Sequence, residues 1–239
     1  MSTLLTAFTK FFVRTLFPAS CVGCGTMDTW LCTSCLEGTP VTPERRCAAC
    51  LKTLGTHIGC QHPLTTLFST GPYRETVLAD AIQSLKYQYV SALAEPLGVR
   101  VAAVLRPHCA AWAPAVIVPI PLHSRRFRER GFNQAERIAR AAGTILNLPV
   151  RTDILHRRRK THRQVGLERD ERLQNLQNAF VVVKRIPLDV RTVILLDDVW
   201  TTGATLTAAA DILHSAGVER VIGCVVASDA PLYNDVRRC

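Results

Sequence analysis

Two neighbouring carboxylates, Asp197 and Asp198, are the residues of this sequence with the clearest chemical potential. They follow the apolar run 193–196 and lead directly into a small, hydroxyl-rich turn, 201–205, that opens a helix. Backbone N–H groups in such a turn, with the positive end of the helix, form a cradle for a phosphate group. Carboxylates beside the cradle can accept hydrogen bonds from sugar hydroxyls, so we expect a sugar-phosphate site with the acids on the ribose. The residues expected to hold the phosphate are Thr201, Thr202, Gly203, Ala204 and Thr205.

The simpler alternative for this stretch is structural. In that interpretation the acid pair only ends a strand, and Thr205 is the N-cap of the helix that follows. The spacing favours a ligand site, because the acids, the Thr-Thr-Gly turn and the closing threonine all come directly after a buried strand. The turn lacks the Gly-Lys ending of a P-loop and the glycine pattern of a dinucleotide-binding fold.

Basic residues are concentrated in the middle of the chain and predict a second anion-binding segment. Residues 123–172 contain fourteen of the 29 lysines and arginines against six acids, within a formal net charge of +10. Arginine binds phosphate through two parallel N–H groups, which makes Arg125, Arg126 and Arg130 candidates for holding a diphosphate. The polar stretch 156–180 is typical of a flap that closes over a substrate. The alternative for these basic residues is a solvated surface that serves solubility.

The ten cysteines predict a metal site rather than a set of disulfides. Seven of them lie between residues 21 and 60, mostly in Cys-x-x-Cys pairs, which indicates zinc knuckles and a reducing, cytoplasmic compartment. Zinc takes four sulfur or imidazole ligands, so eight candidates allow one or two structural ions, paired in sequence or interleaved. His62 is an alternative to His57, and a redox role for the pairs is the weaker alternative. The candidate ligands are Cys21, Cys24, Cys32, Cys35, Cys47, Cys50, His57 and Cys60.

The elements that must position these residues follow an α/β pattern. Apolar runs predict buried strands with helical patterns between them, which indicates βαβ units and a parallel sheet flanked by helices. Ligands of such sheets bind beyond the carboxyl ends of the strands, where the two acids are expected. The segment 75–105 is expected to be largely helical, with a break at Pro96. The predicted strands are 115–120, 180–183, 190–196 and 221–227, and the predicted helices are 133–148 and 205–215.

Composition divides the chain into three parts. Residues 1–20 predict an amphipathic helix, 21–63 a cysteine-rich zinc-binding module, and 64–239 the α/β domain. The first helix is expected to dock on the protein itself, with membrane-surface contact through residues 4–17 as the less favoured alternative. Lys10 interrupts the apolar run of this segment and argues against a signal peptide or a transmembrane span.

Several segments together resemble the competence protein F family. They are residues 118–137 (VPIPLHSRRFRERGFNQAER), the turn DDVWTTGAT, and the spaced residues Gln164, Leu167, Arg172, Asn175 and Phe180. The turn also matches the phosphoribosyl-diphosphate signature of type I phosphoribosyltransferases. The resemblance, which covers nearly the whole chain, implies a type I phosphoribosyltransferase fold with a small N-terminal zinc-binding module. It further implies a phosphoribosyl-diphosphate site that includes Gln164 and, in some naturally transformable bacteria, a part in handling incoming single-stranded DNA.

Two functions follow from these features. In the first, the protein binds phosphoribosyl diphosphate with Mg²⁺ and transfers phosphoribose to an acceptor that the sequence does not identify, in connection with DNA uptake. In the second, it is a non-enzymatic single-stranded DNA-binding protein of the transformation machinery, in contact with DNA-uptake proteins, that uses the zinc module and the basic loops. Salt separates the two, because nucleic-acid affinity falls steeply with ionic strength, whereas a sugar-phosphate pocket depends chiefly on Mg²⁺ and the acid pair.

Overall fold

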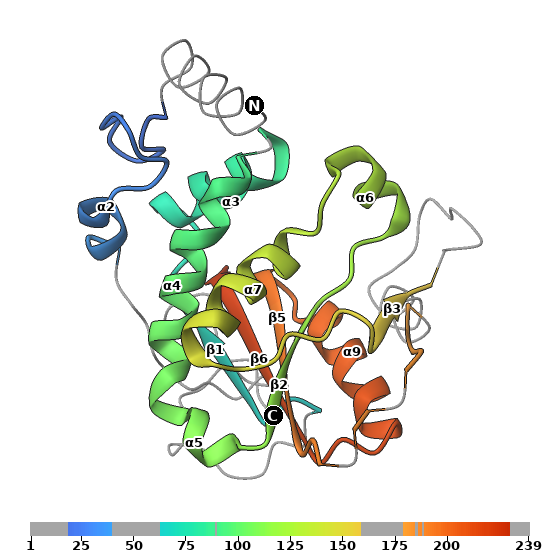
Figure 1. Ribbon diagram of the computed structural model, residues 1–239. Coiled ribbons are helices and arrows are strands. Elements are labelled where there is room, and N and C mark those ends of the chain that lie inside the picture. Colours follow the sequence, from blue (N-terminus) through green and yellow to red (C-terminus); the bar gives the residue numbers. More distant parts are fainter. Residues whose placement is uncertain are drawn as a thin grey trace, which may run out of the picture.

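The computed structural model describes residues 19–39, 63–88, 90–158, 179–184, 186–187 and 189–229. Its central feature is a parallel sheet with the strand order β1-β6-β5-β2 (Figure 1). These strands are β1 Thr66–Ser69, β2 Ala115–Pro119, β5 Thr192–Trp200 and β6 Arg220–Ser228. Their residues are buried almost throughout, because helices cover both faces of the sheet. The predicted α/β architecture with a parallel sheet is confirmed.

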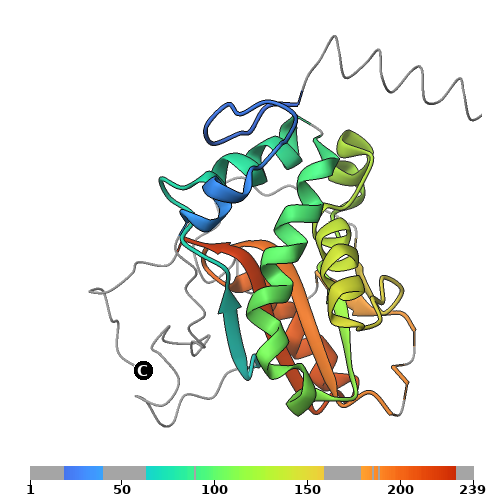
Figure 2. The same cartoon turned by 60° about the vertical axis from the view of Figure 1, so that its left-hand side comes forward.

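Helices form a layer on each face of this sheet (Figure 1; Figure 2). On one face, α3, α4 and α7 share a hydrophobic core with Ile194 and Leu196 of β5. On the other face, α9 shares a second core with Val193 and Leu195 of the same strand. The α-helices are α2 Thr33–Glu37, α3 Val77–Tyr87, α4 Ala94–Leu105, α5 Cys109–Trp112, α6 Ser124–Arg130, α7 Gln134–Leu146 and α9 Ala204–Ser215, and the 3-10 helices are η1 Ser91–Leu93 and η2 Arg106–His108. Successive residues of β5 therefore serve two different cores.

A small antiparallel pair stands apart from the main sheet. It consists of β3, Leu155–Arg157, and β4, Phe180–Val182, with Leu155 opposite Val182. The prediction that the strand 180–183 belongs to the parallel sheet is wrong. Within β4 only Phe180 is fully buried, so this short segment lacks the two apolar faces that a central parallel strand requires.

Several predicted boundaries differ from the observed ones for physical reasons. The helical segment 75–105 divides into α3 and α4 at residues 88–93, not at Pro96. Pro96 lies in the first turn of α4, where backbone N–H groups have no helical partner and proline is tolerated. Residues 124–130, which no predicted helix or strand includes, form α6, which Gly131 ends in the left-handed conformation at φ 73°. The strand β1 had not been predicted.

Arg100 of α4 joins the cysteine-rich segment to the sheet. Its guanidinium group is 5% exposed and donates to the carbonyl oxygens of Leu36, of Thr39 at 2.8 Å and of Thr70 at 2.9 Å. Burial lowers the pKa of Arg100. Because Leu36 and Thr39 belong to the segment 19–39 and Thr70 follows β1, Arg100 fixes this segment against the α/β core. Cys21 and Leu31 of that segment are also buried in the core that contains α3.

Residues 1–18, which make up most of the predicted N-terminal helix, and residues 40–62 lie outside the described residues. Within the described part of the chain, no helix combines the length and the apolar character that crossing a bilayer demands. Because many residues on one side of each boundary are not described, the division of the chain into three parts at residues 20 and 63 stays a prediction.

Candidate functional site

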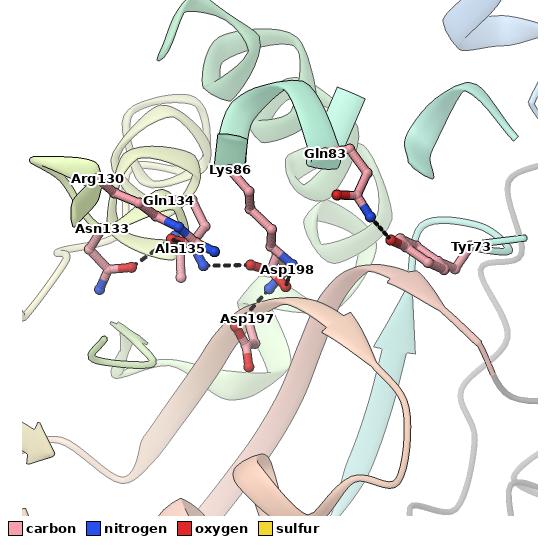
Figure 3. Close-up of polar contacts among 9 residues, drawn as sticks. All are labelled: Tyr73, Gln83, Lys86, Arg130, Asn133, Gln134, Ala135, Asp197 and Asp198. Atoms are coloured by element: carbon pink, nitrogen blue, oxygen red, sulfur yellow. Dashed lines mark hydrogen bonds and ion pairs between the residues drawn. The ribbon is translucent and has the colours of Figure 1, made fainter. Parts of the chain in front are cut away.

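The acid pair lies inside strand β5 and not after it. Pairing with β2 stops at Leu196, whereas β6 runs alongside β5 as far as Trp200. The sequence had placed the end of the strand at Leu196, where the apolar run stops. Asp197 and Asp198 consequently occupy the stretch of β5 that β2 leaves uncovered, at the carboxyl edge of the sheet. Neighbouring strand residues point to opposite faces, and the two carboxyl groups leave the strand in different directions (Figure 3).

Asp198 points toward α3 and α7 and is held by side chains from both helices (Figure 3). It is 6% exposed. Its Oδ1 forms an ion pair with Lys86 Nζ at 2.7 Å, and its Oδ2 accepts a hydrogen bond from Gln134 Nε2 at 2.6 Å. Arg130 donates to Gln134 Oε1 at 3.1 Å and lies over the ring of Tyr87. The negative charge of Asp198 is thus compensated within the protein.

Asp197 has a different environment. It is half-buried, and its Oδ1 accepts the backbone N–H of Asp198 at 2.9 Å. Burial, and then the negative charge of Asp198, raise the pKa of Asp197 to about 7, while Lys86 and Arg157 act in the opposite direction. A carboxyl group of this kind gains stability when a ligand brings hydroxyl groups or a cation to it. Asp197 is therefore the member of the pair that is better suited to contact a ligand.

The turn after β5 is built around Gly203. This residue has φ +77°, and a Cβ atom there would lie 2.2 Å from the ring of Trp200, so only glycine fits. Helix α9 begins at Ala204 with Gly203 as its N-cap, and no cap side chain accepts a hydrogen bond there. The alternative that Thr205 caps this helix is therefore wrong. Because the N-cap residue is glycine, no side chain of the cap itself occupies the N–H groups of the first turn, and these can bind an anion.

The hydroxyl-bearing residues of this turn are accessible from outside the protein. Thr201 and Thr202 are exposed, and Ala204 and Thr205 are half-exposed, at the start of α9. Thr202 Oγ1 accepts the N–H of Ala204 at 3.5 Å. A ligand phosphate can therefore reach both the backbone N–H groups and the threonine hydroxyls.

The predicted arginines lie on α6 and have separate surroundings. Arg125 is exposed and forms an ion pair with Glu129 at 2.8 Å. Arg126 is exposed. Burial lowers the pKa of Arg157 on β3, and the positive charge of Arg126 lowers it further. The negative charge of Asp197 acts in the opposite direction. Arg130, in contrast, is 8% exposed and faces Gln134. The structure thus brings Arg126, Arg157 and Asp197 together and places Arg130 in the buried network around Asp198.

A groove of about 440 Å³ lies between α6 and β3. Its walls include Pro121, Phe127, His156 and Arg157. Phe127 is 48% exposed, which is unusual for a large aromatic side chain. The groove reaches Arg157, whose positive charge also acts on Asp197.

Four cysteines converge in the N-terminal segment. The Sγ atoms of Cys21, Cys24, Cys32 and Cys35 all lie within 4.8 Å of one another. Backbone N–H groups donate to two of them, Cys32 N to Cys21 Sγ at 3.3 Å and Cys35 N to Cys32 Sγ at 3.4 Å. Burial alone would raise the pKa of Cys21, but the backbone N–H groups of Cys32, Cys24 and Gly23 lower it to about 6. Four sulfurs at these separations fit a tetrahedral zinc ion held by the first two knuckles in sequence.

The remaining residues are of two kinds: predicted site residues that the structure does not describe, and neighbours of the acids that were not predicted. Cys47, Cys50, His57, Cys60 and Gln164 lie outside the described residues. Sequence reasoning had missed Lys86 and Gln134 as neighbours of the acids. The sequence does contain an indication for Lys86. This residue continues the buried face of α3 that contains Ile82 and Leu85, and a lysine on a buried face needs an acidic partner.

Comparison with known proteins adds independent information. A phosphoribosyl transferase domain model matches residues 110–238. Competence protein F of Haemophilus influenzae is 38% identical over 109 residues, which are 45% of this chain and 48% of that protein. DNA utilization protein YhgH of Escherichia coli K12 is 29% identical over 201 residues, which are 80% of this chain and 87% of that protein. Competence protein ComFC of Bacillus subtilis is 37% identical over 102 residues, 43% of this chain and 39% of that protein.

Proposed function

The chain belongs to the phosphoribosyl transferase domain family, and we propose on this premise that it binds phosphoribosyl diphosphate at the carboxyl edge of β5. The family agrees with the predicted resemblance to competence protein F and with the predicted type I fold. The observation that carries the proposal is the continuous unit of half-buried Asp197, the Gly203 turn and the uncapped start of α9. A pentose phosphate presents the matching groups, which are hydroxyls for the carboxylate and a dianion for the N–H groups.

Each part of the ligand has a matching part of the site. The first turn of α9, with Thr201 to Thr205, would hold the 5-phosphate through backbone N–H groups and hydroxyls. The acid pair would hold the ribose hydroxyls through Asp197, because both oxygens of Asp198 are already engaged by Lys86 and Gln134. Arg125 and Arg126 would hold the diphosphate together with Mg²⁺, which when bound neutralises part of the diphosphate charge. The cluster Cys21–Cys35 would hold a structural zinc ion.

The same arrangement supports transfer of phosphoribose. In that reaction the bond between C1 of the ribose and the diphosphate oxygen breaks, and a bond from C1 to an acceptor nucleophile forms. Positive charge develops on the ribose and negative charge on the leaving diphosphate. In this proposal Asp197 would stabilise the first and Arg126 the second, so the protein would contribute electrostatic stabilisation and not a covalent intermediate. The names of the relatives support a link of this activity to DNA uptake or utilization.

Calorimetric titration tests the proposal directly. Phosphoribosyl diphosphate with Mg²⁺ is titrated into the zinc-loaded full chain, as wild type and as Asp197→Asn. We expect saturable binding that is about 10-fold to 100-fold weaker in the variant, because a hydrogen bond to a charged group contributes about 1.5–3 kcal/mol. Asp211→Asn, an exposed acid on α9, is the matched control and should bind like wild type. Absence of binding to the wild-type protein would refute the proposal.

A second function is favoured by one specific observation. Phe127, 48% exposed, stands between the exposed Arg126 and Arg128 on α6, and an aromatic ring between cations suits single-stranded DNA. Binding of a fluorescent oligonucleotide should then weaken in Phe127→Ala and fall steeply between about 50 and 200 mM salt. Affinity that is indifferent to salt and to Phe127 would exclude this function for α6.

A further inference from the structure

Asp198 and three neighbouring side chains form a buried polar network (Figure 3). Its members are Lys86 of α3, Arg130 at the end of α6, Gln134 at the start of α7, and Asp198 of β5. Lys86 and Asp198 are 112 residues apart in the chain, and their side chains are 17% and 8% exposed. Buried charged groups are retained only when they are paired, so this network has a defined internal arrangement.

The two oxygens of Asp198 are engaged by different helices. Lys86 binds Oδ1 from α3 at 2.7 Å, and Gln134 donates to Oδ2 from α7 at 2.6 Å. Gln134 is 3% exposed, and the donor Arg130 occupies its Oε1, which directs its NH₂ group to Asp198. The Asp198 carboxylate therefore cannot rotate without breaking a contact to α3 or to α7.

Fixing Asp198 also fixes Asp197. The backbone N–H of Asp198 donates to Asp197 Oδ1 at 2.9 Å, so the position of the second residue orients the carboxyl group of the first. Asp197 points away from the network (Figure 3), and the positive charge of Arg157 acts on its carboxyl group. The contacts form a connected path from Lys86 and Gln134 through Asp198 to Asp197.

From this geometry we infer that the two acids have separate tasks, and that Lys86 and Gln134 are positioning residues of the ribose site. Asp197 contacts the ribose, whereas Asp198 is the anchor that Lys86 and Gln134 hold in place. The inference rests on the proposed binding of phosphoribosyl diphosphate and assigns within it residues 86 and 134, which precede the acid pair by a long stretch of sequence. Preorganised groups of this kind favour binding because the ligand need not order them.

A thermodynamic cycle tests whether Lys86 acts through Asp198. Phosphoribosyl diphosphate with Mg²⁺ is titrated by calorimetry into wild type, Lys86→Met, Asp198→Asn and the double variant. We expect Lys86→Met to bind about 10-fold to 100-fold more weakly than wild type, as for loss of a hydrogen bond to a charged group. In the Asp198→Asn background the same lysine substitution should change affinity less than about threefold, because the contact it removes no longer carries a charge. Lys86→Arg, which keeps the cation, should recover most of the wild-type affinity.

Two controls separate positioning from general destabilisation. Gln83→Met changes a polar residue of α3 that faces Tyr73 and not the acids, and it should bind like wild type (Figure 3). Inorganic diphosphate, which has no ribose, should bind Lys86→Met and wild type equally. Thermal unfolding of every variant is recorded, and the double variant, which removes both buried charges together, remains informative if Lys86→Met does not fold.

The outcomes are distinct. Equal affinity of wild type and Lys86→Met, or additive effects of the two substitutions, overturns the inference and leaves the ligand assignment intact. Equal loss of diphosphate and phosphoribosyl-diphosphate binding in Lys86→Met also overturns it, since Lys86 would then contact the anion itself. If the wild-type protein binds no phosphoribosyl diphosphate, the proposed function fails and the inference fails with it.

Discussion

The Asp197 carboxyl group should make stability fall as pH rises. In the folded protein, burial and the charge of Asp198 raise the pKa of Asp197 to about 7. In the unfolded chain an aspartate titrates near about 3.9. Between these values the folded state binds more protons than the unfolded state, so the free energy of unfolding decreases with increasing pH. The decrease begins near pH 4 and is complete once the pH exceeds about 7.

The size of the effect follows from the difference between the two pKa values. A difference of about three pH units corresponds to about 4 kcal/mol, at about 1.4 kcal/mol per unit. Asp197 is only half-buried, and water on its open side screens the charge, so we expect about 2 kcal/mol. Asp197→Asn removes the charge and keeps an oxygen to accept the Asp198 N–H. The variant should therefore be about 2 kcal/mol more stable than wild type at pH 8 and as stable as wild type near pH 4.

Urea unfolding of both proteins at several pH values between 5 and 8 measures this difference. Other acids do not disturb the comparison because both proteins contain them. For example, Arg151 and Lys184 lower the pKa of Asp153, whose contribution to stability is lost only on acidification. A variant that is less stable than wild type at pH 8, or a stability difference that is constant with pH, would refute the reasoning.

Three further predictions concern the turn, the buried arginine and the metal. Gly203→Ala should lose at least about 2 kcal/mol of unfolding free energy in urea melts, since φ +77° disfavours a side chain and the Cβ would overlap the Trp200 ring; unchanged stability would show that the turn rearranges freely. Arg100→Met should cost about 3 kcal/mol in the same assay, because it leaves carbonyl groups of Leu36, Thr39 and Thr70 buried without their donor; Arg106→Met, an exposed change nearby, should cost less than about 0.5 kcal/mol. Cys24→Ser should reduce bound zinc, measured by elemental analysis, and lower the thermal midpoint, and a wild-type zinc content would exclude Cys24 as a ligand.

The part of the site that is local in sequence could be predicted. The acids, the glycine turn and the helix after it lie within one short stretch, and hydrophobic periodicity identified β5, β6, α7 and α9 to within a few residues. The four clustered cysteines were among the predicted zinc ligands, whereas the pairing of their knuckles, in sequence or interleaved, had been left open and is seen only in the structure. In each case the chemistry depends on residues that are close neighbours in the chain.

What could not be predicted depends on tertiary contacts. Lys86 reaches Asp198 only because α3 packs across the carboxyl end of β5, and nothing near Lys86 in the sequence specifies that packing. Arg130 was predicted to hold a diphosphate together with Arg125 and Arg126. Residues 124–130 instead form a short helix that turns Arg130 inward, while Arg125 and Arg126 stay exposed. The three arginines thus differ in exposure. That difference follows from their positions on the helix, which the sequence alone does not show.

The two acids illustrate why adjacency in sequence does not mean a shared task. Had they followed β5 in a loop, as the apolar run suggested, both carboxylates could have turned toward one ligand. Because β5 continues to Trp200, strand geometry sends Asp197 and Asp198 to opposite faces. The face of Asp198 is covered by α3 and α7, and there a carboxylate persists only with partners such as Lys86 and Gln134. The other face stays open enough for a ligand, so the length of one strand determines which acid is available to it.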